Sequence, residues 1–296
     1  MEERLEVLKT YKLYIGGKFP RTESGRYYKP VNSKNEVLGN ICLGSRKDFR
    51  NAVVAARKVQ EAWAGRTAYN IGQILYRIAE NLEGAKAQFI DLIVKEEGLS
   101  QAKAKSKVET AIDRVIYYAG WSDKFQQIFS AVNPVSSSHF NFSIMEPTGV
   151  VACLIEEEGD FLSLVSAICA TIVGGNTLVV LASENAPLSA ITFAEIINSS
   201  DVPGGVINII TGKVDELKDH FVTHMDVNAL LYIGSHSKSI QEIKSHSADN
   251  LKRITVWSLS EIDKNEFENP FRIKDFLEVK TTWHPIEQIG GAAAGY

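Results

Sequence analysis

The sequence predicts an α/β fold in which a doubly wound, mostly parallel sheet has helices on both faces. The first observation is a set of short segments rich in Val, Ile and Leu, which is typical of strands buried on both faces of a parallel sheet. The second is that segments with helical periodicity separate these strands, as they do in α/β proteins. The predicted strands are 150–155, 177–181, 206–210, 229–233 and 252–257.

The helices are predicted from apolar periodicity and from the residues at their ends. Ser45 and Asp48 form a weak version of the capping box at the start of the first helix. Gly98 indicates the end of the third helix, and Pro187 occupies a favoured first helical position between two strands. Four helices are predicted before the sheet. The first begins at Ser45, the second covers 68–83, the third ends at Glu97 and the fourth runs from near Ser100 to near Phe129.

Shorter strands are predicted outside the parallel sheet. YKLYI (11–15) and RYYKPV (26–31) flank a turn-rich stretch and are predicted to pair with each other. VLGNICL (37–43) is a further strand candidate. SSSHFNFSI (136–144) alternates polar and apolar residues, which indicates an exposed or half-buried strand.

The composition excludes several classes of protein. Of the 296 residues, 45% are hydrophobic and 23% charged, as in an ordinary globular protein. The net charge of −4 disfavours a nucleic-acid partner, because phosphate binding needs a basic surface. The three cysteines lack the close spacing of a disulfide framework or a zinc site, so a reducing compartment fits better.

No membrane partner is expected from the sequence. The uncharged stretch 161–182 is about long enough to span a bilayer, but Gly174-Gly175-Asn176 interrupts it. A buried helix followed by a buried strand is the preferred interpretation. MEERLEVLK (1–9) has no apolar signal core. We therefore expect a cytoplasmic protein.

Four segments stand out by their order and spacing: EPTGVVACLI (146–155), GGNTLVVLASENAP (174–187), DVPGGVINIITG (201–212) and LYIGS (231–235). They resemble the nicotinamide-binding domain of the aldehyde dehydrogenase superfamily. LKRITVW (251–257) is similar to the strand that carries the family's general-base glutamate, and FLEVKTTW (276–283) is similar to the family's C-terminal strand. The chain also resembles the truncated C-terminal half of the aldehyde dehydrogenase 16 subfamily.

The resemblance implies how the chain is divided. Residues 1–130 and 149–258 would form a discontinuous Rossmann-like domain of the NAD-binding type. Residues 131–148 and 259–296 would form a small β-flap, the element that builds the oligomer in this family. Only 39 residues, 258–296, follow the point after which family members carry the catalytic domain, so that domain is expected to be absent.

The same resemblance implies that the chain has no catalytic residues. Trp257 falls on the general-base glutamate, and indole cannot take a proton at neutral pH, so packing is its preferred role. Glu158 falls on the asparagine that donates to the substrate oxyanion, and a carboxylate cannot donate. Cys42, Cys153 and Cys169 all precede the region of the family's nucleophile, and their apolar neighbours indicate inert core thiols.

The candidate pyrophosphate contact is Gly234 with Ser235, directly after a predicted strand. A dinucleotide site needs backbone amides at a helix N-terminus, and this is where the family provides them. Ser239 replaces the second glycine of the family pattern, so a plain tight turn is the alternative interpretation.

The candidate ribose contact is Glu184, which matches a family glutamate that binds adenosine ribose hydroxyls. Leu181 replaces the lysine that accompanies it and cannot donate to a hydroxyl, so a solvated carboxylate is an equal alternative. Gly205 is the remaining candidate cofactor residue. We expect either no cofactor or weak binding of NAD(P).

The acidic run EEEGD (156–160) lies where pyrophosphate would sit. Two like unit charges about 5 Å apart repel by about 3 kcal/mol at an effective dielectric constant near 20. A divalent cation could bind such a run, but a solvated acidic loop is preferred and no metal site is expected. HFVTH (220–224) lacks the glutamate of the zinc-protease pattern and is interpreted as a surface or helix-end feature.

The leading functional hypothesis is a non-catalytic structural or regulatory subunit. It would assemble with a full-length aldehyde dehydrogenase subunit, or with itself, through the β-flap strands 136–146 and 276–283. Two alternatives remain. One is a nucleotide-binding regulatory module. The other is NAD(P)-dependent aldehyde dehydrogenase activity that exists only within a larger complex.

Overall fold

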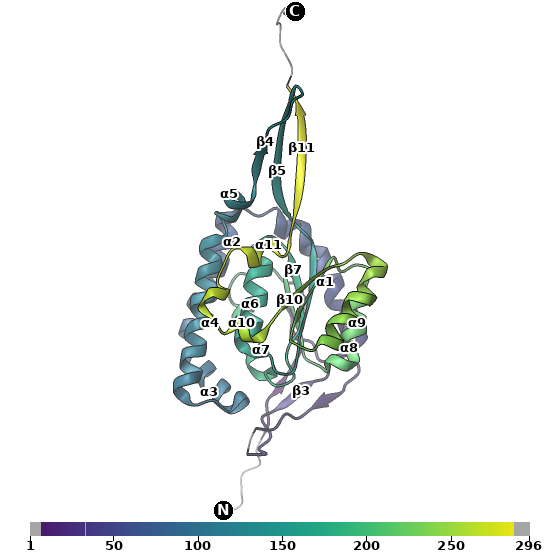
Figure 1. The fold of residues 1–296 in the computed structure, drawn as a ribbon. Helices are drawn as coiled ribbons and strands as arrows, with labels where there is room; N and C mark the ends of the chain where they lie inside the picture. Colours follow the sequence, from purple (N-terminus) through teal and green to yellow (C-terminus); the bar gives the residue numbers. More distant parts are fainter. Residues whose placement is uncertain (1–6, 33, 287–296) are drawn as a thin grey trace, which may run out of the picture.

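The computed structural model describes residues 7–32 and 34–286. Its centre is a parallel sheet with the strand order β10-β9-β6-β7-β8 (Figure 1). The doubly wound α/β fold and the positions of these strands are therefore confirmed. The strands are β6 (Val150–Ile155), β7 (Thr177–Leu181), β8 (Ile207–Ile210), β9 (Ala229–Ile233) and β10 (Arg253–Trp257).

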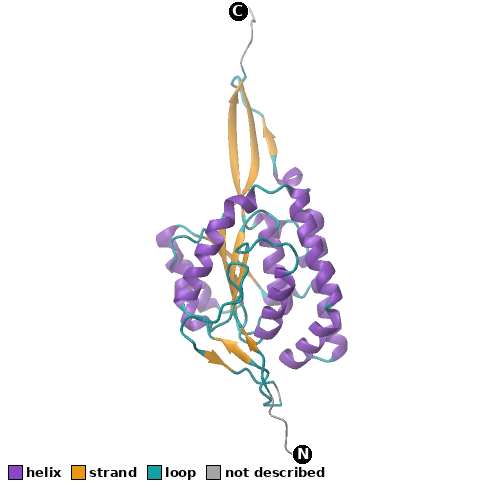
Figure 2. Ribbon diagram, turned by 180° about the vertical axis from the view of Figure 1, so that it is seen from behind, coloured by secondary structure: helices purple, strands orange, loops and turns teal. Residues whose placement is uncertain are grey.

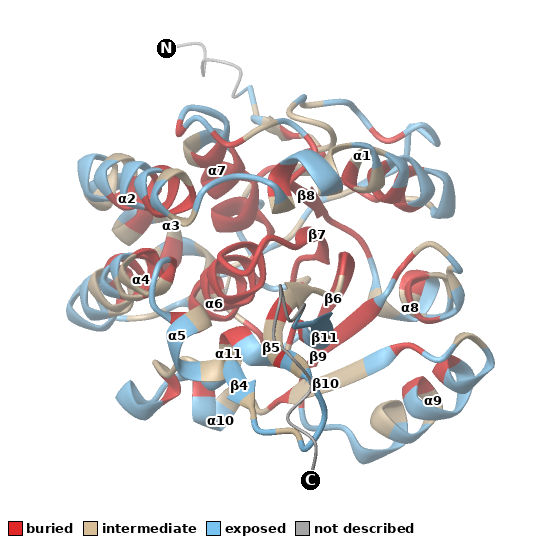
Figure 3. Ribbon diagram, turned by 90° about the horizontal axis from the view of Figure 1, so that it is seen from above, coloured by how far each residue is buried: buried red, intermediate tan, exposed pale blue. Residues whose placement is uncertain are grey.

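Helices cover both faces of this sheet. α6 and α7 pack on one face beneath an outer layer of α2, α3 and α4, whereas α1, α8 and α9 cover the other face (Figure 3). Every residue of α6 is buried, because this helix lies between the sheet and α4. The helices are α1 (Arg46–Ala64), α2 (Ala68–Gly84), α3 (Lys86–Glu97), α4 (Gln101–Trp121), α5 (Phe125–Phe129), α6 (Phe161–Ile172), α7 (Pro187–Asn198), α8 (Val214–Thr223) and α9 (Ser237–Ser247).

The local signals for the helix ends are confirmed, with one exception. Ser45 and Asp48 form a complete capping box on α1, and Gly98 ends α3 with a φ of 68°. The continuous helix expected up to Phe129 is wrong, because α4 ends at Trp121 and α5 follows after a turn. In that turn a backbone N–H donates to the carbonyl oxygen three residues earlier, as the Lys124 N–H does to Trp121 O.

The N-terminal strands do not pair as predicted. β1 (Thr10–Tyr11) and β2 (Tyr27–Tyr28) both pair with β3 (Asn40–Cys42), which lies between them. The reason lies in the rest of the predicted first strand. Tyr14 exchanges backbone hydrogen bonds with Ile209 of β8, so this stretch is held against the central sheet and not against β2.

A three-stranded antiparallel sheet, the β-flap, projects from the body of the molecule (Figures 1 and 2). Its order is β11-β5-β4, with β4 at Ala131–Asn133, β5 at His139–Pro147 and β11 at Leu277–Pro285. The predicted flap segment 259–296 differs from expectation at its start, and its residues 287–296 lie outside the described residues. Residues 259–276 contain short helices, of which α10 and α11 pack against α6, and they bury Ile262, Phe267, Ile273 and Phe276. These helices are α10 (Leu259–Ile262), η2 (Asn265–Phe267) and α11 (Phe271–Lys274).

The stretch 161–182 consists of α6 followed by β7, as the glycine pair predicts. Across the residues that the structure describes, no helix has both the length and the apolar character that a bilayer crossing requires.

Gly205 allows α1 to lie close to the start of β8. Its φ is +105°, and a Cβ atom at this position would lie 2.7 Å from the backbone oxygen of Ala55 in α1. We predict that Gly205→Ala lowers the free energy of unfolding by at least about 2 kcal/mol, because a non-glycine residue is strained at such a φ and the backbone contact leaves no room. Urea denaturation measures this.

The matched control is Gly84→Ala, because nothing lies within 4 Å of a Cβ atom at Gly84 and its φ is ordinary. This variant is expected to be neutral or stabilised by up to about 1 kcal/mol, since alanine favours a helix end more than glycine does. Equal stabilities of the two variants would contradict the packing role of Gly205.

Candidate functional site

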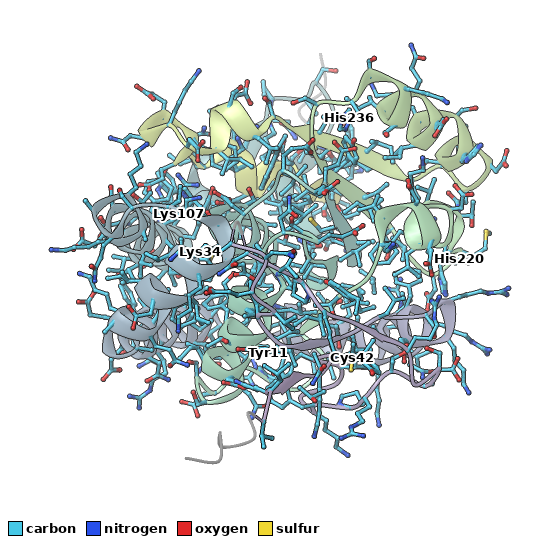
Figure 4. All side chains as sticks on the ribbon, turned by 90° about the horizontal axis from the view of Figure 1, so that it is seen from below. Tyr11, Lys34, Cys42, Lys107, His220 and His236 are labelled. Atoms are coloured by element: carbon cyan, nitrogen blue, oxygen red, sulfur yellow. The ribbon has the colours of Figure 1, made fainter. Side chains whose placement is uncertain are left out.

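The candidate site lies at the carboxyl edge of the sheet, between β6 and β9. From β6 the chain continues to β7 and β8 on one side, and then crosses to β9 and β10 on the other. Ligands of open α/β sheets bind at such a topological switch point. The loops after β6 and β9 therefore bring Glu156, Glu158 and Gly234 to one place (Figure 4 views this edge and labels His236).

Glu156, the first residue after β6, points into this switch point and is only 6% exposed. The Tyr232 hydroxyl donates to one of its carboxylate oxygens, and Nδ1 of His236 contacts the other. Gly234 makes room for the carboxylate, because a Cβ atom there would lie 2.5 Å from Glu156 Oε2. The chain thus places its own carboxylate at the point where β9 leads into α9.

The contact with Glu156 changes the ionisation of His236. The hydrogen bond that His236 makes to Glu156 is the main cause that raises the pKa of His236, and the charge of the same carboxylate adds to it. The imidazole itself is 62% exposed. The opposite nitrogen, Nε2, lies 4.0 Å from Glu158 Oε1. His236 therefore connects a buried carboxylate with an exposed one.

Glu156, Glu158 and His236 are also the residues that could hold a metal ion. One ligand atom from each lies within 4.8 Å of the others. Carboxylate oxygens and imidazole nitrogens are common ligands of divalent cations. However, the hydrogen bonds of Glu156 to Tyr232 and His236 account for this arrangement without a cation.

The pocket beside this cluster is strongly acidic. Its volume is about 180 Å³, and carboxylates line most of it. Lys218, its only lysine, is already paired with Glu242 at 2.7 Å. A pyrophosphate here would meet several like charges, each of which repels it by a few kcal/mol at most at an effective dielectric constant near 20. The acidic residues that line the pocket are Glu156, Glu157, Glu158, Glu184 and Asp215.

Glu184 lines the same pocket from the end of β7. Its Oε1 accepts a hydrogen bond from the backbone N–H of Val214, at the start of α8, with a donor–acceptor distance of 3.2 Å. Burial raises the pKa of Glu184, and the Val214 bond opposes this rise. Glu184 thus accepts a hydrogen bond at the N-terminus of a helix, a position that favours an anion.

Of the other predicted cofactor residues, Gly234 and Ser235 lie at the switch point and Gly205 does not. Gly234 and Ser235 reach the switch point, where the Gly234 N–H donates to the Trp257 backbone oxygen and the Ser235 side chain is exposed. Gly205 precedes β8 and so lies at the amino edge of the sheet, opposite the pocket. Gly205 packs closely against the backbone of Ala55, and this contact is its role in the structure.

Trp257 is a fully buried residue at the end of β10. Its Nε1–H donates to Asp275 Oδ2 at 3.0 Å, and its ring packs against Phe267 and Phe276 with centroid distances of 5.0 and 5.7 Å. Burial is the main cause that raises the pKa of Asp275. Phe267 of η2 and the residues that follow α11 therefore cover the position that the family resemblance assigns to the base.

The three cysteines are buried. Burial raises the pKa of the Cys169 thiol to about 12 and that of Cys153 well above its ordinary value. A thiolate is the nucleophilic form of cysteine, so these two thiols are unreactive at neutral pH. His224 lies beyond the end of α8, where burial lowers its pKa and its ring packs edge-on against Phe49.

Tyr232 and His236 are the site residues that the sequence analysis missed. A tyrosine inside a buried strand carries a hydroxyl that needs a partner, and this signal pointed to a buried acceptor nearby. His236 follows the glycine–serine turn, and its proximity to Glu156 depends on β9 lying beside β6.

We predict that Glu156→Gln lowers the pKa of His236 toward its ordinary value of 6.5. The contact between His236 and Glu156 raises the folded-state pKa of His236. The contribution of this contact to stability is therefore complete below about pH 6.5 and is lost as the pH rises through the folded-state pKa. In Glu156→Gln this loss with rising pH should shrink. An NMR titration of the histidine ring protons, combined with denaturation at several pH values, measures both effects. His224 serves as the internal control, and an unchanged pKa of His236 would refute the pairing.

Comparison with known proteins agrees with this architecture. Residues 19–257 match the model of the aldehyde dehydrogenase family. An aldehyde dehydrogenase of Alternaria alternata is 32% identical over 251 residues, which are 82% of this chain and 49% of that protein. The mouse cytosolic 10-formyltetrahydrofolate dehydrogenase is 28% identical over 262 residues, 86% of this chain and 29% of that protein.

The structural comparison leads to the same family. The NAD⁺ complex of an aldehyde dehydrogenase from Bacillus cereus superimposes with a TM-score of 0.79 and 26% identity, over 84% of this chain and 51% of that one. The chain thus spans about half the length, or less, of the relatives that it matches. On the family match and the shared fold, this chain belongs to the aldehyde dehydrogenase family.

Proposed function

We propose that this chain is a non-catalytic member of its family that acts as a structural or regulatory subunit. It assembles, through the β-flap, with a full-length aldehyde dehydrogenase subunit or with itself. The observation that carries the proposal is the combination of a projecting strand edge with a switch point already filled by the chain's own carboxylate.

The chemistry of the site supports the non-catalytic part of the proposal. By the family resemblance, Trp257 stands in place of the general base, and its indole is buried and bonded to Asp275. Glu158 stands in place of the oxyanion donor, and an ionised carboxylate only accepts hydrogen bonds. Neither side chain can perform the step that its position requires.

The β-flap supports the assembly part. β11 is an edge strand of nine residues, and the unpaired backbone groups of such an edge are a template for another strand. The flap also exposes large apolar side chains on both of its faces. Exposed patches of this kind mark interaction sites. These side chains are Val132, Phe140, Val279 and Trp283, at 67%, 48%, 60% and 55% exposure.

We predict that the chain shows no saturable binding of NAD⁺ or NADH up to about 1 mM, because the acidic pocket repels the pyrophosphate. The double variant Glu157→Gln/Glu158→Gln should bind NAD⁺ at least about tenfold more tightly, which brings saturation into the measured range. Isothermal titration calorimetry measures both. The double variant Glu146→Gln/Glu278→Gln removes the same charge from the flap and is the control. Saturable binding by the parent chain would instead favour a nucleotide-binding regulatory module.

We predict that the chain forms a complex of fixed stoichiometry when mixed with a full-length aldehyde dehydrogenase of its own organism, or with itself. Native mass spectrometry measures the complex, and NAD(P)-dependent oxidation of aldehydes, with and without the chain, measures its effect. Trp283→Glu should weaken the complex at least about tenfold, since a charge would then lie in an apolar contact.

The matched control for this experiment is Tyr27→Glu. Tyr27 is 59% exposed and belongs to β2, in the small sheet at the end of the molecule opposite the flap (Figure 1). A monomeric chain that ignores every full-length enzyme would refute the assembly role. A complex that is insensitive to Trp283→Glu would show that the flap is not the interface.

A further inference from the structure

We propose that two copies of this chain pair edge to edge through β11, antiparallel and centred on Thr281. This inference rests on the proposed assembly role and names its partner, a second copy. β11 is the long edge of the flap sheet, whereas the opposite edge, β4, has three residues. From Glu278 to Pro285 the side chains of β11 are exposed or half-buried.

The hydrogen bonds between β5 and β11 determine which backbone groups face outward. At one end Thr148 N–H donates to Phe276 O at 3.1 Å, and at the other Ile286 N–H donates to Ser138 O at 3.0 Å. The register between these points is unbroken. In an antiparallel pair every second residue bonds to the partner strand. The even-numbered residues of β11 therefore bond to β5, and Val279, Thr281 and Trp283 direct their N–H and C=O groups outward.

Thr281 is the central residue of β11, so a two-fold axis there overlaps the strand with its copy. The main-chain bonds fall to residues 279–283, because Pro285 has no N–H and the Leu277 oxygen already accepts from Arg253. In this register Thr281 faces Thr281, and Val279 faces Trp283 on both sides of the axis. All three residues have outward backbone groups, so each of their N–H groups meets a carbonyl group of the partner. Main-chain bonds of this kind provide affinity in strand addition.

The side chains are complementary in the same register. Val279 and Trp283, 60% and 55% exposed, lie on one face of the flap and would meet across the axis. Aromatic and β-branched residues are a favourable cross-strand pair. On the opposite face Glu278 would lie opposite His284, and both side chains are exposed. The strand is thus complementary to its own reverse in its apolar residues, and it places a carboxylate opposite an imidazole on the other face.

Neighbouring registers lack this match. An axis through Lys280 places the two Lys280 side chains directly opposite each other, and like charges at such a position destabilise a strand pair. An axis through Thr282 places Pro285 opposite Val279, where an outward N–H is required and proline has none. The axis through Thr281 avoids the lysine contact and moves Pro285 to the end of the overlap, opposite Leu277, so the three central pairs keep their N–H groups.

Cysteine cross-linking tests this register directly. In Thr281→Cys the two introduced cysteines would lie opposite each other with a Cα–Cα distance of about 5.5 Å, inside the range of about 4.4–6.8 Å that a disulfide needs. The native cysteines are buried and do not compete. Mild oxidation should convert Thr281→Cys to a covalent dimer of twice the 32.7 kDa chain mass. Lys280→Cys should stay uncoupled, since its copies are more than about 7 Å apart.

A second variant pair tests the backbone bonds without relying on oxidation. Thr281→Pro removes an N–H that faces outward and leaves the bonds between β5 and β11 in place, so the flap is retained. Native mass spectrometry of the full chain should show a dimer for the parent and for Thr281→Val, and a monomer for Thr281→Pro. Thermal unfolding checks that all three are folded.

The outcomes separate this inference from the function on which it rests. A monomeric parent chain that joins a full-length aldehyde dehydrogenase would overturn the self-pairing and leave the subunit role standing. A dimer that links through Lys280→Cys but not Thr281→Cys would overturn the register. A dimer that survives Thr281→Pro would overturn the edge contact. A chain that stays monomeric and joins no partner would overturn both proposals.

Discussion

The rest of the structure depends on the position of β6 between β7 and β9. Every residue of this strand is buried, with alternate side chains in the two cores on either side of the sheet. Its neighbours run in the same direction, so the loops after β6, β7 and β9 all leave at one edge. A parallel sheet covered on both faces leaves only its ends open to solvent. The side chains of the candidate site therefore meet at that edge.

At that edge the chain itself supplies the anions. Glu156 takes hydrogen bonds from Tyr232 and His236 beside the turn into α9, and Glu184 takes the N–H of Val214 at the start of α8. Helix N-termini at this edge commonly hold the phosphates of a ligand. A buried carboxylate is tolerated only when it is well hydrogen-bonded, and Glu156 meets this requirement. The same contacts that stabilise the chain thus oppose an anionic cofactor.

The β-flap differs from the central sheet, because it has two exposed faces and no core of its own. Hydrogen bonds at its base tie it to the body. Gln126 bonds to both the N–H and the C=O of Met145, and Asn176 donates to the Phe276 oxygen while accepting from Gly149. An isolated strand pair is at best marginally stable in water. A flap of this shape gains stability when another strand or surface covers it, which is the physical basis of the proposed assembly role.

The sequence by itself determined the elements and the chemical nature of several key positions. Apolar runs located the strands of the central sheet, because burial on both faces requires such runs. Ser45 and Gly98 located helix ends, because capping depends on residues only a few positions apart. The family resemblance places Trp257 and Glu158 at the base and oxyanion positions, and that these side chains do not suit such roles depends on side-chain type alone.

Only the tertiary structure decided which of these residues meet. The contact of Glu156 with His236 requires β9 to lie beside β6, and the separation of Gly205 from the pocket requires the direction of β8. The pairing of both β1 and β2 with β3 likewise depends on Tyr14 bonding to Ile209. These contacts join residues far apart in the chain. Their geometry follows from strand order and direction, which local periodicity does not encode.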